Sequence, residues 1–224
     1  MKVDLVVSGA VLEHFQQPHS CASIIVDQIN SGYYNRCEKY IKDKLVIDIG
    51  ANIGLFTLYA AQMADKVLSV EPTRSHQEVF NKLLEDNDVN NVDILKGALA
   101  TQNQTLDFYE SAKNSTMNSL FNYEPNSQTT YQVQGMTLEH ILNSSNGRVG
   151  FIKIDIEGSE KFLLEDSSFF ESLNRTESLF LEVHEVDGKR FDKIYSEWTE
   201  KLKTVFKNIS RIGVDGIWCT KEEL

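Results

Sequence analysis

Carboxylates and a histidine follow two apolar segments of the sequence, at positions where an active site could form. One segment runs into Asp155 and Glu157, and another runs into Glu182 and His184. Side chains two residues apart on a strand point to the same face, so each pair shares a face. Histidine titrates near neutral pH and is the usual general base for a hydroxyl. We therefore predict Asp155, Glu182 and His184 as catalytic residues, with His184 accepting a proton.

Simpler interpretations of these residues stay open. One carboxylate could cap a helix that starts near Ser159, and Glu157 could merely complement the dipole of that helix. His184 could be hydrogen-bonded at the edge of a sheet for structural reasons. Alternatively, Asp155, Glu182 and His184 could hold a divalent cation, since magnesium prefers oxygen ligands. The sequence does not decide between a cation and a bare base, so no metal ligand is assigned.

A turn containing two glycines follows the first apolar segment and precedes a helical pattern. Gly50 ends the segment, and Gly54 follows four residues later. Glycine lets the backbone approach a ligand closely, and the first N–H groups of the helix are free to bind it. Glu71 ends the next apolar segment, 17 residues after Gly54. An acid at that position is placed to accept hydrogen bonds from both ribose hydroxyls of an adenosine.

The glycine spacing distinguishes dinucleotides from adenosine cofactors that have no pyrophosphate. Dinucleotide binding requires G-x-G-x-x-G, whereas Asn52 occupies the third position of this loop, and no lysine follows as in a P-loop. A cofactor without a pyrophosphate needs less bare backbone here, and S-adenosylmethionine is such a cofactor. Asp48 could help to hold its ammonium group. The predicted cofactor-binding residues are Asp48, Gly50, Ala51, Asn52, Gly54, Glu71, Pro72, Ala98 and Asp155.

Five short aliphatic segments that alternate with helical patterns position these residues. Near-continuous apolar segments suit strands that are buried on both faces, as in a parallel sheet. The alternation predicts a doubly wound α/β fold. Ser75 and Glu78 are spaced as a capping box at one helix start, and the longest helical stripe covers 191–206. The five segments are 45–49, 67–70, 92–95, 149–154 and 179–183.

The two ends of the chain depart from this alternation. Residues 1–42 are expected to form an N-terminal cap, with a helix around 23–30, before a domain of residues 43–224. Residues 209–220 are predicted to form an antiparallel hairpin, because Asp215-Gly216 is a type I′ turn signal.

A polar stretch, residues 101–135, also interrupts the pattern. It is rich in asparagine, serine, threonine and glutamine. We predict one short strand, 105–109, followed by a loop. We expect residues 111–134 to act as a lid over the substrate that accepts the transferred group, because long irregular loops are often functional.

Composition excludes several classes of protein. The 224 residues carry a net charge of −11, and such an acidic surface repels phosphate backbones and anionic lipids. Neither nucleic acid nor a membrane is therefore the expected partner. No secretory signal or spanning segment is visible, and the cytoplasm is the expected compartment.

Several motifs in order resemble those of the FkbM family of S-adenosylmethionine-dependent methyltransferases, over about residues 43–186. Their order and spacing are more specific than any one of them, and the last three distinguish this family from other class I methyltransferases. Glu71-Pro72-Thr73-Arg74 lacks the second proline of the family pattern, which affects a turn more than the chemistry. The motifs are DIGANIG at 48–54, EP at 71–72, Asn87 with NNV at 90–92, NSL at 118–120, TLE at 137–139, KIDIEGSE at 153–160 and LEVH at 181–184.

The resemblance implies a Rossmann-like, mostly parallel seven-stranded sheet that ends in an antiparallel hairpin. It also implies O-methylation of a sugar, a glycan or a small natural product with S-adenosylmethionine as the methyl donor. Two alternatives remain: a nicotinamide-dependent oxidoreductase, which the glycine spacing disfavours, and a non-catalytic adenosine-binding module. The acceptor and the oligomeric state are not evident from the sequence.

Overall fold

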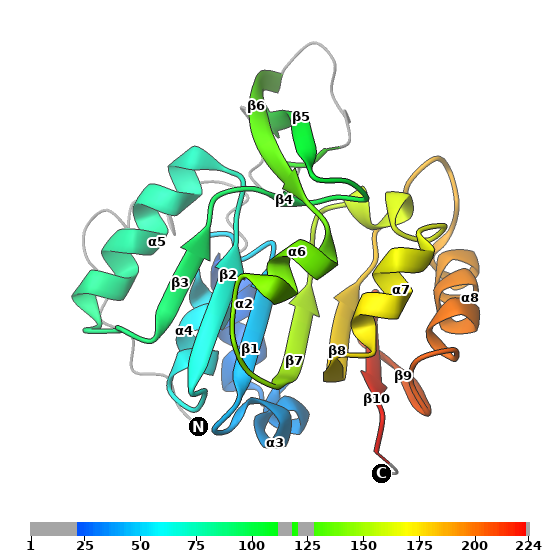
Figure 1. Ribbon diagram of the computed structural model, residues 1–224, viewed down its shortest axis with the longest axis horizontal. Coiled ribbons are helices and arrows are strands. Elements are labelled where there is room, and N and C mark those ends of the chain that lie inside the picture. Colours follow the sequence, from blue (N-terminus) through cyan, green and yellow to red (C-terminus); the bar gives the residue numbers. More distant parts are fainter. Residues whose placement is uncertain (1–21, 112–117, 121–127, 223–224) are drawn as a thin grey trace.

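The computed structural model describes residues 22–111, 118–120 and 128–222. Its main sheet orders seven strands as β3-β2-β1-β7-β8-β10-β9 (Figure 1). The first five strands in this order run parallel, while β10 is antiparallel to both β8 and β9. The predicted fold class is therefore confirmed. The strands are β1 (Leu45–Ile49), β2 (Lys66–Val70), β3 (Val92–Leu95), β7 (Val149–Ile154), β8 (Thr176–Glu182), β9 (Asn208–Ile212) and β10 (Gly216–Thr220).

Helices cover both faces of this sheet, which is why the aliphatic segments are apolar without alternation. Every residue of β1 and β7 is buried. One face packs on α6, α7 and α8, where Trp198 is a large buried side chain. The opposite face packs on α2, α3 and α4 through a cluster of aromatic rings that includes Tyr34 and Phe56. The helices are α2 (Ala22–Asn30), α3 (Glu38–Ile41), α4 (Leu55–Ala61), α5 (Arg74–Asp86), α6 (Leu138–Asn143), α7 (Ser167–Leu173) and α8 (Phe191–Leu202), with 3-10 turns η1 (Asn35–Cys37) and η3 (Ser159–Phe162).

The start of α5 differs from the sequence prediction. The residue before the helix is Thr73, not Ser75, and its side chain makes no capping hydrogen bond. Ser75 lies inside the first turn and donates instead to Glu110 on β5. The capping box was therefore wrong, because a tertiary contact uses the serine hydroxyl.

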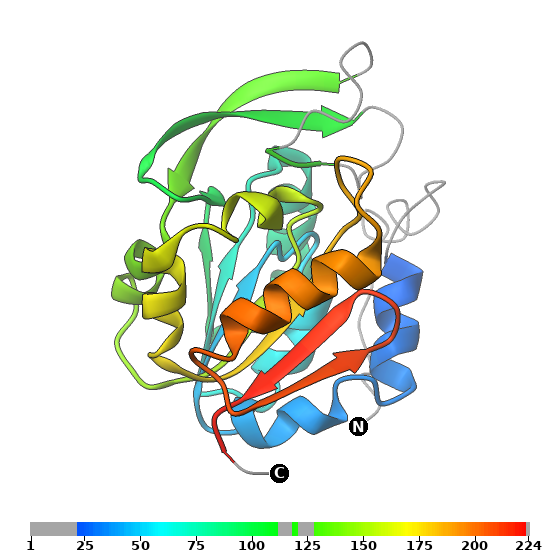
Figure 2. The ribbon, with the colours of Figure 1, turned by 90° about the vertical axis from the view of Figure 1, so that its right-hand side faces the viewer.

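The polar stretch contains more regular structure than predicted. The expected strand is present as β5 (Gln104–Ser111), but a second long strand, β6 (Gln128–Met136), pairs with it antiparallel, and β4 (Ala98–Leu99) completes a small sheet. This second sheet lies beyond the carboxyl ends of the parallel strands (Figures 1 and 2). One face of this second sheet buries Phe108 and Val133. Because only alternate residues of its strands need to be apolar, the composition of the segment is polar overall. Most of the predicted lid lies outside the described residues, at 112–117 and 121–127.

The C-terminal hairpin is confirmed, but its turn is not the predicted one. Gly216 pairs with Ile212 in the ladder between β9 and β10. The connection is therefore three residues long, Gly213 to Asp215, rather than a two-residue turn at Asp215-Gly216. Arg211 stabilises it by donating two hydrogen bonds to the carbonyl oxygen of Val214.

Candidate active site

The glycine loop after β1 is shaped by its contacts with the protein. Gly50 has a positive φ of 79°, and a Cβ there would lie 1.8 Å from the carbonyl oxygen of Asp155. A Cβ on Gly54 would lie 2.1 Å from the ring of Phe80. Both glycines are therefore required for packing, where the loop crosses the end of β7 and contacts α5. The sequence analysis had explained them only by the close approach of a ligand.

Replacing Gly50 by alanine is expected to destabilise the fold more than the same change at Gly188. Both glycines have a positive φ, so the left-handed backbone destabilises each alanine variant by about 1–2 kcal/mol. Only Gly50 meets backbone atoms, because the position of a Cβ on Gly188 has no atom within 4 Å. The clash adds about 1–3 kcal/mol. Chemical denaturation of the two variants measures the difference, and equal losses would contradict the packing role of Gly50.

Glu71 at the end of β2 anchors the same loop. Its carboxylate accepts hydrogen bonds from the backbone N–H groups of Asn52, at 2.7 Å, and Thr73, at 2.8 Å. Asn52 has a positive φ of 54°, and its side-chain oxygen accepts from the next N–H, that of Ile53. Asparagine tolerates this conformation better than most residues. Glu71 is thus held rigidly, with only 3% of its surface exposed.

A cavity of about 280 Å³ opens between this loop, the carboxyl ends of the parallel strands and the second sheet. It brings together most of the residues predicted for cofactor binding and catalysis. Asp48 and Gly54 are the exceptions, since neither lines the cavity. The predicted residues that do line it are Gly50, Ala51, Asn52, Glu71, Pro72, Ala98, Asp155, Glu182 and His184.

Asp48 lies within β1 rather than at its end, and it is completely buried. Its Oδ2 accepts a hydrogen bond of 2.6 Å from the hydroxyl of Thr57 on α4. In the sheet it is directly opposite Lys153 of β7. Burial raises the pKa of Asp48, and the nearby Lys153 opposes this shift. In this structure Asp48 is therefore a neighbour of the buried lysine rather than part of the cavity wall.

Lys153 is a site residue that the sequence analysis missed. Only 3% of its surface is exposed, and its Nζ lies 2.9 Å from Oδ2 of Asp155. Burial lowers the pKa of the lysine, but Asp155 and Asp48 outweigh that effect and raise the pKa above its ordinary value. A lysine inside an aliphatic strand was the available signal, because such a residue is almost never buried unless it is paired.

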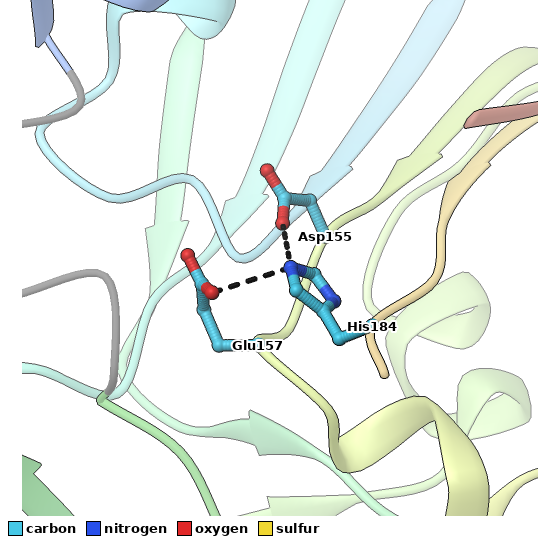
Figure 3. Close-up of side chains that lie close together, drawn as sticks. All are labelled: Asp155, Glu157 and His184. Carbon is cyan, nitrogen blue, oxygen red and sulfur yellow. Dashed lines mark ion pairs between the residues drawn. The ribbon is translucent and has the colours of Figure 1, made fainter. Parts of the chain in front are cut away.

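Three side chains at the ends of β7 and β8 converge, and we call Asp155, Glu157 and His184 the rim cluster (Figure 3). The Nε2 atom of His184 lies 3.2 Å from Oε2 of Glu157 and 3.9 Å from Oδ1 of Asp155. On the other side of the ring, Nδ1 lies 3.2 Å from Oε1 of Glu160. Glu160 is buried and also accepts from the backbone N–H of Ile156.

The local backbone brings Glu157 into the rim cluster. β7 ends at Ile154, and Glu157 takes a left-handed conformation with a φ of 51°. The 3-10 turn that follows begins after Gly158 and has no side-chain cap. The helix-capping interpretation of these carboxylates is therefore not what the structure has.

Negative charge dominates the electrostatics of the rim. Burial lowers the pKa of His184, but Glu160 and Glu157 outweigh it and raise the pKa far above its ordinary value. Burial raises the pKa of Glu157 to about 7. Asp155, together with burial, raises the pKa of Glu182 to about 8. The Asp155 carboxyl keeps a lowered pKa, because Lys153 and His184 outweigh its burial.

Two segments outside the main sheet complete the cavity wall. The N-terminal segment contributes Ile25, Gln28 and Tyr34, and a short piece beside the second sheet contributes Asn118 to Leu120. This piece is tied to the rim, since the backbone N–H of Leu120 donates to Oγ of Ser159 at 3.1 Å. The sequence motif that contains Asn118 was recognised, but its place in the wall was not.

The strand order, the terminal hairpin and a cavity at the carboxyl ends of the strands define a class I methyltransferase fold. A family model for the methyltransferase FkbM domain matches residues 48–206. The chain therefore belongs to the FkbM methyltransferase family, whose methyl donor is S-adenosylmethionine, and the predicted family and cofactor are confirmed. No curated protein sequence matches the chain.

Solved structures support the fold. A methyltransferase FkbM from Methylobacillus flagellatus KT is similar at a TM-score of 0.52 and 14% identity, covering 79% of this chain and 43% of its own. An rRNA methylase from Streptococcus thermophilus is similar at a TM-score of 0.53 and 10% identity, covering 85% of this chain and 95% of its own. This chain thus spans less than half of the Methylobacillus protein. Among the described residues, each helix is too short or too polar to cross a bilayer.

Proposed function

We propose that this protein transfers a methyl group from S-adenosylmethionine to a hydroxyl of a sugar, a glycan or a small natural product. One observation carries the proposal: one cavity is lined both by the glycine loop and Glu71 and by the carboxylates and histidine that follow β7 and β8. The first set suits an adenosine, and the second suits a hydroxyl that must lose a proton.

The cofactor end of the cavity fits an adenosine without a pyrophosphate. Glu71 already accepts two backbone hydrogen bonds, but an ionised carboxylate has about four acceptor sites. His76 also lies beside this carboxylate, with Nδ1 3.5 Å from Oε1. The remaining acceptor positions would serve the ribose hydroxyls, and the bonds to Asn52 and Thr73 hold the carboxylate in position for them. Pro72 and Ala98 form nearby wall.

The acceptor end would be formed by Asp155, Glu182 and His184. S-adenosylmethionine supplies a methyl group on an already reactive sulfonium, so the protein mainly positions the acceptor oxygen and removes its proton. Asp155 is fixed by Lys153 and would orient the acceptor. Glu182, which lines the same wall, would help to hold the hydroxyl.

The role of His184 as proton acceptor depends on a nearby positive charge. The two glutamates beside the ring favour a proton on it, whereas a general base must be free of its proton before the reaction. A cation among these carboxylates, such as the cofactor's sulfonium, would reverse that preference. We therefore propose that His184 accepts the hydroxyl proton only in the loaded site.

Calorimetry distinguishes this function from its alternatives. S-adenosylhomocysteine is expected to bind and NAD is not, since the loop lacks a dinucleotide fingerprint. Binding of NAD alone would favour an oxidoreductase. A screen of hydroxylated sugars, glycans and natural products with radiolabelled S-adenosylmethionine would then find the acceptor. Cofactor binding without transfer to any hydroxyl in the screen would favour a non-catalytic adenosine-binding module.

We also propose a cytoplasmic location. Cys37 and Cys219 are free and buried, as is usual for proteins of a reducing compartment. The acidic net charge of −11 supports an acceptor other than nucleic acid.

A further inference from the structure

We propose that the rim cluster, Asp155, Glu157 and His184, binds a divalent cation. Each of these residues offers one ligand atom, and the three atoms lie within 4.8 Å of one another. They come from the ends of two adjacent strands and face a common point (Figure 3). Each side chain is 20–27% exposed, and all three residues line the cavity. The inference concerns binding, and only its catalytic meaning rests on the proposed function.

His184 is oriented as a metal ligand. Glu160 lies at Nδ1, which leaves Nε2 directed toward the two carboxylates. A carboxylate behind the imidazole is the arrangement that fixes the ring of most metal-binding histidines. Glu160 cannot easily move away, because it is buried and accepts from the backbone N–H of Ile156. Glu160 is therefore a positioning residue for the site.

Asp155 supplies an independent observation. Its Oδ2 is bound to the ammonium of Lys153 at 2.9 Å. Its Oδ1 is enclosed and has no hydrogen-bond partner within the described part of the chain, although Nε2 of His184 lies 3.9 Å away. A buried carboxylate oxygen without a partner is costly. A cation held between Oδ1, Glu157 and Nε2 would satisfy it.

The two carboxylates and the imidazole together favour a cation that binds both oxygen and nitrogen ligands. Carboxylates suit magnesium and manganese, and imidazole suits later transition metals, so manganese accommodates both kinds of ligand. Three protein ligands leave coordination positions open toward the cavity. An acceptor hydroxyl could occupy one of them, where the ion would hold its oxygen and stabilise the negative charge that develops there. In that role His184 would hold the ion through Nε2, and the hydroxyl proton would pass to another carboxylate of the cavity wall, such as Glu182.

Manganese is the probe for the first experiment. The full chain, stripped with a chelator, is titrated with Mn²⁺ and followed by the loss of the free-ion electron paramagnetic resonance signal. We expect one site, with a nitrogen coupling from the imidazole in pulsed spectra. Glu157→Gln should weaken Mn²⁺ binding by more than the ~10–100-fold that loss of an outer-shell partner costs. His184→Gln should abolish the nitrogen coupling.

Asp187→Asn is the matched control. It removes the same charge from a nearby loop, where Asp187 is exposed and paired with Lys161, and it should leave Mn²⁺ affinity within about twofold. The wild-type nitrogen coupling requires no variant, so a variant that fails to fold does not prevent the test. Absence of a bound ion or of nitrogen coupling in the wild-type protein would overturn the proposal, as would equal Mn²⁺ affinity in Glu157→Gln and Asp187→Asn.

The proposed function can fail separately. S-adenosylhomocysteine is titrated into the stripped protein without Mn²⁺. Binding of the nucleoside without any Mn²⁺ site would remove the cation and keep the cofactor. Mn²⁺ binding without the nucleoside would keep the cation site and remove the proposed function.

Discussion

Replacing His184 by alanine is expected to lower the turnover number for methyl transfer by about 10²–10⁴-fold, the usual contribution of a general acid or base. The affinity for S-adenosylhomocysteine should change little, because His184 follows β8, which β1 and β7 separate from β2 and its Glu71. Steady-state rates on the acceptor, together with calorimetry, separate the two quantities. The same loss is expected whether His184 accepts the proton itself or acts through a bound ion.

Two further variants make the His184 test specific. Asp155→Asn keeps the size of the side chain and should also lower turnover, while His140→Ala, a histidine on α6 outside the cavity wall, should leave it unchanged. Full activity of His184→Ala would exclude the residue from the chemistry. Loss of cofactor affinity in both His184→Ala and Asp155→Asn would place these side chains at the methionine end of the cofactor instead.

The positions of the parallel strands in the main sheet could be predicted because their signals are local and redundant. Each buried strand is a continuous aliphatic segment, and the helices between them carry their own periodicity. The β5–β6 sheet was partly missed for the opposite reason. Only alternate residues such as Phe108 and Val133 are buried there, and the remaining positions are polar, so the composition resembles that of a loop.

Contacts distant in the sequence explain two other differences between the expectations and the structure. Ser75 is spaced as a helix cap, but its hydroxyl binds Glu110 from another element. Asp48 precedes the glycine loop by two residues, yet the register of β1 against β7 places it beside Lys153 instead of in the cavity wall. Sequence spacing indicates which residues are close along one helix or strand. The contacts of Ser75 and Asp48, in contrast, depend on a neighbouring element.

The location of the candidate site could be predicted from the sequence, but the contacts among its residues could not. The carboxyl ends of parallel strands meet at one edge, so Asp155, Glu182 and His184 were expected together. The contribution of Glu157 depends on a left-handed residue after the strand, and that of Glu160 depends on a 3-10 turn folding back toward β8. Neither conformation has a clear sequence signal. The roles of all these residues stay predictions.

Glu71→Ala is expected to weaken binding of S-adenosylhomocysteine by about 1.5–3 kcal/mol, the range for hydrogen bonds to a charged group, which corresponds to roughly 10–150-fold. The physical reason is the loss of an ionised acceptor for the two ribose hydroxyls. Calorimetry on the purified variant gives the number directly. Unchanged affinity would remove Glu71 from the cofactor site.

A weaker affinity alone would not show that Glu71 contacts the ribose, because the same carboxylate anchors the loop through Asn52 and Thr73. An S-adenosylhomocysteine analogue that lacks the ribose hydroxyls separates the two effects. In a thermodynamic cycle over protein and ligand, a direct contact makes the cost of Glu71→Ala much smaller for the analogue than for the parent ligand. Loss of the loop anchor alone would instead cost both ligands the same free energy, and the ribose would then need another partner in the cavity wall.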